Sequence, residues 1–415
     1  MRESLSQRNL FLSGLVLSFV LSGLSLGQDH PISAEDFGMH IQWQAPWPTI
    51  PFGSWRVPVA WSWVEPQPGV WNFERPDTYL KEASEHGNPE LLFSLGYSAP
   101  WASSKPNILK SPGGPGGCAP PKNIDDWRGY VKALGERYKG KVKYYEVWNE
   151  PTVPFFWCGS TSDLVNLTRA TSEVLKQIDP ANQILSPSAV TTARLRRPIE
   201  SGIGWVNDFL RHGGGNYVDI IAFHFYFAPS PPEGIYGAVK ALREVMDKNG
   251  VGDKPIWDTE DSWGGEPLDP DTEAGYVARV LLMDFSAGVS RTFWYAWGAP
   301  TVKLRLSSED MKSASPAGVA FKVVQDWLIG GVLKSCTSSD IPSAFVASHA
   351  MWTCELQQGA SEQKIVWNPD GDKDFKIPPA WHVSRMRDLS GGSSPIPASG
   401  HITIGGKPIL LDQGK

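Results

Sequence analysis

Two stretches decide how this chain is interpreted: YEVWNEP at residues 145–151 and PIWDTED at residues 255–261. Each is an apolar, strand-like run that ends on a glutamate, Glu150 in the first and Glu260 in the second. A carboxylate at the end of a buried strand loses much of its solvation, so its presence there needs a compensating role. The two stretches therefore predict strands that carry chemically active carboxylates at their carboxyl ends.

The chain from about residue 36 to 330 repeats this alternation of short apolar runs and helical patterns. Between residues 125 and 138, for example, the apolar side chains fall on one helical face, and Gly140 ends the helix. Alternation over this length predicts an α/β fold, a (β/α)8 TIM barrel. The predicted strands are residues 37–42, 55–61, 90–95, 142–148, 183–186, 220–225, 255–259 and 291–297, and the predicted helices are residues 75–85, 125–138, 162–178, 237–248, 272–285 and 316–328.

One connection departs from this repeat. Residues 43–54, between the first two predicted strands, are rich in proline and have no helical period, so we expect the first helix to be short or missing. A doubly wound open sheet is the structural alternative. No glycine-rich phosphate-binding turn follows the first strand, which favours the barrel.

The pattern changes after Gly330, where short strand-like pieces are separated by turn residues. This predicts a small C-terminal all-β, sandwich-like accessory domain at residues 331–415, packed against a catalytic barrel at residues 28–330. The predicted strands of this domain are residues 343–347, 351–356, 364–367, 382–386, 401–404 and 408–411.

The charge of the chain and its N-terminal segment indicate which partners to exclude and in which compartment the protein is found. The 415 residues carry a net charge of −6 and no run of lysines or arginines, so we expect neither nucleic acid nor an anionic membrane as partner. Residues 1–27 have Arg2 and Arg8, then an apolar run shorter than the ~20 residues of a spanning helix, then small residues at a cleavage site. They predict a signal peptide, a secreted or periplasmic protein and no membrane association after cleavage; an uncleaved anchor is the alternative.

Four cysteines in an exported chain predict two disulfides. We favour Cys118 with Cys158 and Cys336 with Cys354, because each pair lies in neighbouring segments, although two other connectivities are possible. No Cys-x-x-Cys or His-Cys cluster occurs, so no metal is expected. The chain also has 19 tryptophans, and those in loops are suited to stacking on sugar rings: Trp47, Trp101, Trp157 and Trp263.

The positions of the two glutamates indicate a specific chemistry. Active sites of such barrels form at the carboxyl ends of the strands, and Glu150 ends the fourth predicted strand while Glu260 ends the seventh. These strands face each other, so the carboxylates are expected about 5 Å apart, the separation used by retaining glycosidases. One must be a protonated acid and the other an ionised nucleophile, with no metal or cofactor.

The sequence resembles clan A glycoside hydrolases, most closely family 39, with features shared by family 5. The matching motifs fall in order on the predicted strands: WRVPV at 55–59, GYSAPWAS at 96–103, WNEP at 148–151, HFY at 224–226 and the tryptophan region at 294–298. The resemblance implies that Glu150 is the general acid/base and Glu260 the nucleophile. It further implies roles in substrate binding or support of Glu260 for Asn149, Arg56, His224, Tyr226 and Trp297, with Trp101 and His40 as further candidates.

Some neighbouring acids compete for these roles. Glu146 lies four residues before Glu150 and deeper in the barrel. Asp258 would point to the same side as Glu260 if the strand is regular, and Asp261 would point away. Trp294 and Trp297 would likewise lie on opposite faces, so one of them is expected to be packing.

Together these features predict a secreted retaining glycoside hydrolase that acts on an oligo- or polysaccharide with β-linked sugars, such as a β-xylosidase or a cellulase-like enzyme. An arabinofuranosidase is an alternative within the enzyme class. A non-catalytic carbohydrate-binding barrel is the alternative outside it.

Overall fold

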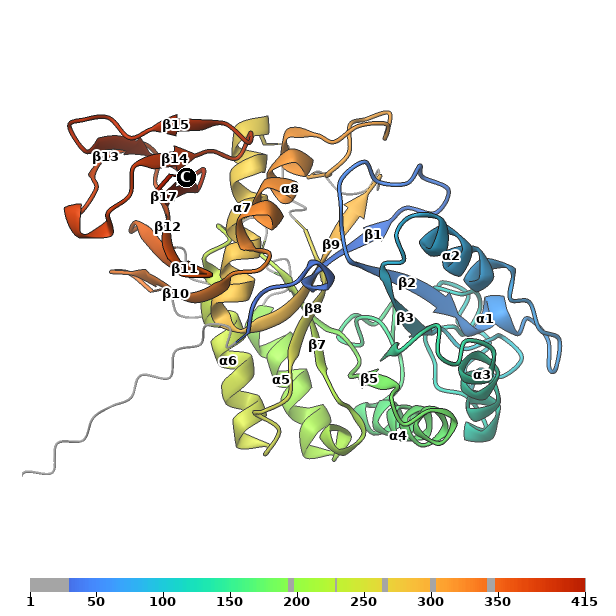
Figure 1. Cartoon of the computed structure of the whole chain (residues 1–415). Coiled ribbons are helices and arrows are strands. Elements are labelled where there is room, and N and C mark those ends of the chain that lie inside the picture. The colour runs from blue at the N-terminus through green and yellow to red at the C-terminus, as the bar shows by residue number, and fades with distance from the viewer. Residues whose placement is uncertain are drawn as a thin grey trace, which may run out of the picture.

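A computed structural model of the chain describes residues 30–192, 198–227, 230–262, 268–298, 304–341 and 348–414 (Figure 1). The predicted signal peptide at 1–27, Trp263 and the predicted strand at 343–347 lie outside the described residues. Within the described ranges, no helix combines the length and the apolar character needed to cross a membrane.

The first part of the chain forms a parallel sheet that curls into a barrel. Its strand order is β5-β4-β3-β2-β1-β9-β8-β7-β6. These strands are β1 (Phe37–Ile41), β2 (Ser54–Ala60), β3 (Glu90–Gly96), β4 (Tyr144–Val147), β5 (Gln183–Leu185), β6 (Ala189–Thr192), β7 (Ile221–Tyr226), β8 (Ile256–Asp261) and β9 (Val289–Trp297).

The nine strands occupy eight barrel positions, because β5 and β6 are two halves of one strand. Pro187 stands between them and has no N–H to continue a ladder. Leu185 at the end of β5 pairs with Ile220, and Ser188 before β6 pairs with Asn149 after β4, so the ring closes through the broken strand. The predicted (β/α)8 class is confirmed, and the open doubly wound sheet is excluded.

Helices cover the outside of the barrel. No helix separates β1 from β2, as the proline-rich segment predicted, whereas the short α1 and the long α5 were not predicted. Residue 198 opens α5, whose apolar positions Ile203, Val206 and Leu210 have helical spacing that could have revealed it. The barrel helices are α1 (Trp61–Val64), α2 (Glu74–Glu85), α3 (Ile124–Arg137), α4 (Thr161–Ile178), α5 (Pro198–Arg211), α6 (Gly234–Lys248), α7 (Pro270–Ala287) and α8 (Pro316–Leu328), with short 3-10 turns at Ala34–Asp36 and Gly214–Tyr217.

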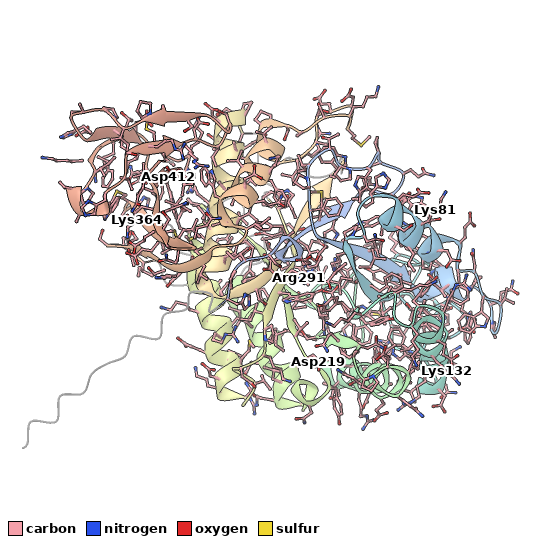
Figure 2. All side chains as sticks on the ribbon, viewed as in Figure 1. Lys81, Lys132, Asp219, Arg291, Lys364 and Asp412 are labelled. Carbon is pink, nitrogen blue, oxygen red and sulfur yellow. A yellow bond between two sulfur atoms is a disulfide. The ribbon has the colours of Figure 1, made fainter. Side chains whose placement is uncertain are left out.

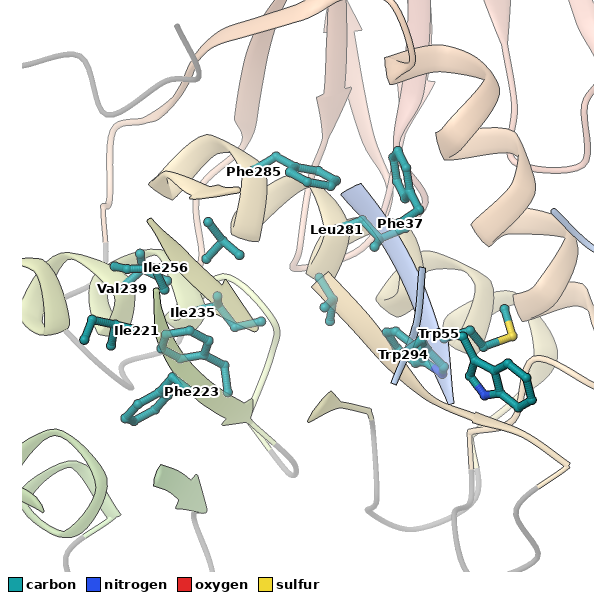
Figure 3. Close-up of a cluster of buried hydrophobic side chains, with 14 of the residues drawn as sticks. Phe37, Trp55, Ile221, Phe223, Ile235, Val239, Ile256, Leu281, Phe285 and Trp294 are labelled. Atoms are coloured by element: carbon teal, nitrogen blue, oxygen red, sulfur yellow. The ribbon is translucent and has the colours of Figure 1, made fainter. Parts of the chain in front are cut away.

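The main hydrophobic core lies between the outer face of the strands and these helices. Figure 3 shows Phe223 of β7 and Ile256 of β8 facing Ile235 and Val239 of α6. Removing such apolar surface from water provides most of the stabilisation of the fold. Charged side chains such as Lys81 lie on the solvent side of the same helical layer (Figure 2).

The C-terminal part is all-β, as predicted, and lies beside α7 and α8 (Figure 1). It has a six-stranded antiparallel sheet and a separate two-stranded one. The predicted strand 382–386 is largely wrong: a 3-10 turn at Pro379–Trp381 leads into His382, whose φ of 51° is left-handed, and the strand begins only at Arg385. The strands are β10 (Val332–Ser338), β11 (Trp352–Gln358), β12 (Ser361–Trp367), β13 (Lys373–Lys376), β14 (Arg385–Arg387), β15 (Ser393–Pro395), β16 (His401–Ile404) and β17 (Ile409–Asp412).

Three buried polar side chains join the two parts of the chain. Arg279 of α7 donates two hydrogen bonds of 2.6 Å each to the carboxylate of Glu233, which precedes α6. The indole N–H of Trp367, in β12, donates to the same carboxylate at 2.8 Å. We call Glu233, Arg279 and Trp367 the interdomain clasp.

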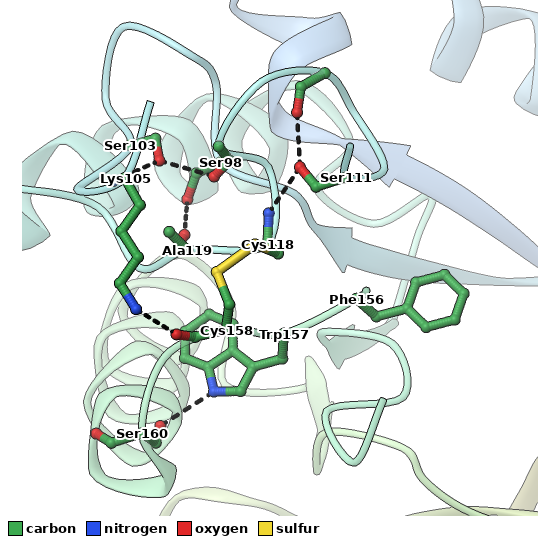
Figure 4. The surroundings of a disulfide bond; sticks show 12 residues. Ser98, Ser103, Lys105, Ser111, Cys118, Ala119, Phe156, Trp157, Cys158 and Ser160 are labelled. Carbon is green, nitrogen blue, oxygen red and sulfur yellow. Dashed lines mark hydrogen bonds between the residues drawn. A yellow bond between two sulfur atoms is a disulfide. The ribbon is translucent and has the colours of Figure 1, made fainter. Parts of the chain in front are cut away.

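Both favoured disulfide pairings are confirmed. Cys118–Cys158 joins the segment after β3 to the segment after β4, where the amine of Lys105 also donates to the Cys158 carbonyl at 2.6 Å (Figure 4). Cys336–Cys354 joins the adjacent strands β10 and β11. The first bridge therefore fixes two of the loops that border the carboxyl end of the barrel.

Candidate active site

The two glutamates meet at the carboxyl end of the barrel. Carboxylate oxygens of Glu150 and Glu260 and a ring nitrogen of His224 all lie within 4.8 Å of one another. Glu150 follows β4 in a turn where its φ is 44° and that of Trp148 is 74°, left-handed values that few residues other than glycine adopt. Glu260 lies in β8, the seventh barrel strand, on the other side of the ring.

An irregularity in β8 turns Glu260 into the barrel. The register of β8 against β9 shifts between Asp258 and Asp261, as in a β-bulge. Thr259 and Glu260 both contact barrel-interior residues, whereas Asp258 lies with Asp261 against α7. The prediction that Asp258 shares a side with Glu260 is therefore wrong, because it assumed a regular strand, whereas Asp261 points away from Glu260 as predicted.

Arg56 of β2 organises the acids. Its Nε donates to Glu146 at 2.8 Å and Nη1 donates to Glu260 at 2.9 Å, while Nη2 bonds Glu146 and donates to Asn149 at 2.7 Å. Arg56 is 5% exposed and Glu146 is fully buried, so this pair is shielded from solvent. Glu146 therefore neutralises the arginine at depth and does not compete with Glu150 for the substrate.

A hydrogen-bonded chain leads from Glu146 to Glu150. The hydroxyl of Thr259 donates to Glu146 at 2.6 Å, so its oxygen accepts from Nε2 of His224 at 3.2 Å. Burial lowers the pKa of His224 to about 4, so the ring is neutral and its single proton sits on Nε2. The Nδ1 lone pair then faces Oε1 of Glu150 at 3.1 Å, and this contact is a hydrogen bond only when Glu150 is protonated.

The environment of Glu150 agrees with a protonated carboxyl. Burial raises its pKa to about 7, with the charge of Arg56 opposing the rise and that of Glu146 adding to it. Within the described residues, His224 is the partner of its side chain. Glu150 therefore has the properties of an acid that keeps its proton near neutral pH.

Glu260 is held differently, by donors that favour the charged form. The hydroxyl of Tyr226 donates to Oε1 at 2.7 Å and Arg56 donates to Oε2 at 2.9 Å. Burial raises the pKa of Glu260, but the charge of Arg56 and the bond from Tyr226 both act to lower it. The two carboxyls thus have opposite surroundings, which is the arrangement that separates an acid from a nucleophile.

The remaining candidates fall at different distances from this pair. Nε2 of His40 donates to the Thr259 carbonyl at 2.9 Å, and the His40 ring lies 5.1 Å from that of Tyr295. Trp297 is fully buried at the end of β9, and Trp294 is buried within the cluster of hydrophobic side chains of Figure 3. Trp101, in the segment after β3, packs on Trp61 of α1, and its indole N–H donates to the carbonyl of Glu65, which follows α1. Trp101 therefore joins the segment after β3 to the segment after β2.

Sequence reasoning missed three residues of the site. Thr259 bonds both His224 and Glu146, and Tyr97 and Tyr295 lie close enough to the glutamates that these charges, after burial, contribute to the raised pKa of each phenol. Alternation along the ninth strand could have revealed Tyr295, because it is one residue from the outward Trp294. Thr259 and Tyr97 lie within the quoted stretches 255–261 and 96–103, but the pattern did not single them out.

The three side chains Glu150, His224 and Glu260 are close enough to serve as metal ligands. Both oxygens of Glu260, however, already accept hydrogen bonds from Tyr226 and Arg56. The positive charge of Arg56 would also repel a cation at this point. The donor set is therefore better suited to acid–base chemistry than to metal binding.

Comparisons with known proteins agree with this geometry. Residues 121–320, which include both glutamates, match the family model described as glycosyl hydrolase catalytic core. A search of curated proteins gave no match. This match confirms the predicted resemblance to glycoside hydrolases and the predicted class of enzyme, a glycosidase.

Solved structures show the same fold at low sequence identity. A family 39 glycoside hydrolase from Bacteroides cellulosilyticus WH2 is 21% identical, with a TM-score of 0.68 over 92% of this chain and 82% of that one. A monomeric β-xylosidase from Caulobacter crescentus CB15 is 15% identical, with a TM-score of 0.59 over 87% and 89%. A conserved exported protein from Bacteroides fragilis is 13% identical, with a TM-score of 0.65 over 92% and 98%.

Proposed function

We propose that this protein is a retaining glycoside hydrolase in which Glu150 is the general acid/base and Glu260 the nucleophile. The observation that carries the proposal is the contrast between two carboxyls within 4.8 Å of each other. Glu150 faces the lone pair of a neutral histidine, whereas Glu260 accepts from Arg56 and Tyr226. A short separation leaves no room for the water of an inverting enzyme, whose carboxyls are about 6.5–9.5 Å apart.

The reaction then proceeds in two displacements. An oxygen of Glu260 attacks the anomeric carbon as the bond to the leaving group breaks, and Glu150 gives its proton to the departing oxygen. A covalent glycosyl ester of Glu260 results. Water next loses a proton to Glu150 and attacks the same carbon, which releases the sugar and restores both groups. Asn149, whose Oδ1 accepts from Arg56, can donate an amide N–H to a sugar hydroxyl.

For the substrate we propose a β-linked glycoside, with β-xylosides as the first class to assay because a similar structure is described as a β-xylosidase. For the location we propose export, to the periplasm or the medium. Two disulfides favour an oxidising compartment, and another similar structure is described as an exported protein.

The two carboxyl roles are tested by Glu150→Ala and Glu260→Ala with azide as external nucleophile. If the roles are correct, Glu150→Ala retains activity on substrates with good leaving groups and gives a β-glycosyl azide. Glu260→Ala gives the α-azide instead, because azide then occupies the position of the missing carboxylate. Glu136→Ala, at an exposed helical position, is the matched control. Near-full activity of either active-site variant, or azide products of the opposite configuration, contradicts the assignment.

The substrate class is tested by hydrolysis of aryl β-xylosides, β-glucosides and α-L-arabinofuranosides together with plant polysaccharides. We expect cleavage of at least one β-linked substrate with retained configuration in the first-formed product. Cleavage of the arabinofuranoside alone would contradict the β-linked class. Binding without hydrolysis across the whole panel would indicate the non-catalytic barrel.

A further inference from the structure

A second cluster of carboxyls lies directly behind the nucleophile strand. Asp258 and Asp261 of β8 and Asp284 of α7 each offer an oxygen within 4.8 Å of the other two. All three are at most 1% exposed. Three carboxyls removed from water at one point need compensation, because an isolated buried charge is very costly.

No side chain supplies that compensation in the described part of the chain. Neither a lysine, an arginine nor a histidine forms an ion pair with Asp258, Asp261 or Asp284 there. Five of the six carboxylate oxygens also have no hydrogen-bond partner among the described residues; the exception is Oδ1 of Asp261, which accepts from the Ser262 N–H at 2.6 Å. Backbone N–H groups of Phe225 and Glu260 lie near Asp258 without completing a bond.

Shared protons are the alternative to a cation at this cluster. A protonated carboxyl is a donor and needs an acceptor at about 2.5–3.0 Å. One oxygen of each carboxyl lies within 4.8 Å of one oxygen of each of the other two, a span that a single cation can bridge.

A neutral side chain, Thr292, also lies at the cluster of three aspartates. Thr292 of β9 stands opposite Asp258 in the parallel register, so the two side chains share a face of the sheet. Its hydroxyl is buried, at 1% exposed, and has no hydrogen-bond partner among the described residues. It also lies close enough to Asp284 to act on that carboxyl. With it, the cluster offers six free oxygens from four side chains.

We propose that Asp258, Asp261, Asp284 and Thr292 bind one hard cation of the size of calcium between β8, β9 and α7. Calcium takes six to eight oxygen ligands at about 2.3–2.6 Å, so ligands on opposite sides of the ion lie about 4.8 Å apart. Magnesium is smaller, keeps several waters and holds its ligands more closely. The free oxygens match the calcium requirement in kind and number, and one oxygen of each carboxyl lies within 4.8 Å of the other two.

The position gives the ion a positioning role in catalysis. Asp258 and Asp261 flank Thr259 and Glu260, and the register shift falls between those two aspartates. A cation that holds both aspartates on the outer face of β8 fixes the bulge that turns Thr259 and Glu260 inward. The site is separate from the proposed reaction chemistry, so its test does not require that the carboxyl roles be correct.

The test is metal analysis and thermal unfolding of the purified full chain. We expect about one calcium per chain by mass spectrometry after dialysis, and a Tm in EGTA that rises on the order of 5 °C when calcium is restored. Less than a tenth of an equivalent of metal, together with a Tm that does not respond to calcium, would overturn the proposal. A rise with magnesium and not with calcium would overturn the assignment of size.

Asp284→Asn should change the Tm measured with calcium in opposite directions, depending on whether the cluster binds a cation or not. If a cation binds, this variant loses the bound calcium and the calcium-dependent rise in Tm. If no cation binds, it removes one of three repelling carboxyls, so its Tm in the presence of calcium exceeds that of the wild type, and this result would overturn the proposal. Thr292→Val keeps all three carboxyls and is expected to weaken calcium binding about tenfold, through the loss of one ligand. Asp326→Asn, on the exposed face of α8, is the control and should match the wild type.

Discussion

Thr259→Val tests whether the hydrogen-bonded chain from Glu146 to His224 sets the protonation of Glu150. Valine keeps the shape of the side chain but removes the hydroxyl that bonds Glu146 at 2.6 Å and His224 at 3.2 Å. Nε2 of His224 then has a proton and no acceptor in a fully buried site. A buried donor left unsatisfied costs about 1–3 kcal/mol.

Moving the histidine proton to Nδ1 relieves this cost. Nδ1–H donates a stronger hydrogen bond to the ionised carboxylate than to the protonated carboxyl, so the variant favours the ionised form of Glu150. Since about 1.4 kcal/mol corresponds to one pKa unit, we expect the pKa of Glu150 to fall by about one unit from its value of about 7. At pH 7 the protonated fraction would drop from about one half to about one tenth, a loss of about fivefold in activity that needs the acid.

The assay is the pH profile of kcat/KM, which reports groups of the free enzyme. We expect the alkaline limb to move about one unit towards acid for a substrate with a poor leaving group. A dinitrophenyl glycoside, which departs without a proton, should be almost unaffected. Thr168→Val is the matched control, because Thr168 is equally buried and its hydroxyl donates to the Leu164 carbonyl on α4, away from the two glutamates. An unshifted limb, or an equal loss on both substrates, would refute the tautomer reasoning.

Three further outcomes follow from the same contacts. In the wild type, kcat/KM should fall tenfold per pH unit above about pH 7, because Glu150 loses its proton there. This alkaline limb should be missing in Glu150→Ala on activated substrates. A limb that persists in the variant contradicts the role of Glu150. Tyr226→Phe removes a donor to the charged form of Glu260, so the acidic limb should move up by about one unit, as measured on the same substrates. Arg279→Met leaves the buried Glu233 carboxylate without its positively charged partner. The free energy of unfolding, measured in urea, should therefore fall by about 3–5 kcal/mol. A fall of less than about 1 kcal/mol would show that the interdomain clasp is not stabilising.

Much of the barrel follows from local pattern. Apolar runs of strand length, each ending near a turn, predict all eight barrel positions, and the failure of the helical period at residues 43–54 predicts the missing first helix. The division of the fifth strand into β5 and β6 depends on a single residue, Pro187, whose effect on a ladder is visible only when the neighbours are known. The C-terminal strands are less predictable, because β13 and β15 are short and mostly exposed.

The active site, like the barrel, was predicted from the sequence only in part. Glu150, Glu260, Arg56 and Tyr226 were predicted from motifs and do meet, but the motifs say nothing about hydrogen bonds between them. The side taken by Asp258 was predicted wrongly and that of Asp261 correctly, because the bulge between them adds a residue that alternation does not count.

The interdomain clasp determines how this protein can be divided or recombined. A cut near Gly330 looks harmless along the chain, yet it would strip Trp367 from Glu233 and uncover the Trp352–Trp367 stack, whose ring centroids are 5.8 Å apart. The segment at Ile32 also exchanges two backbone hydrogen bonds with Gly330 and Gly331. The C-terminal sheets thus cannot be removed without exposing buried side chains. A truncated or chimeric enzyme must keep these sheets or replace them with another structure that covers α7.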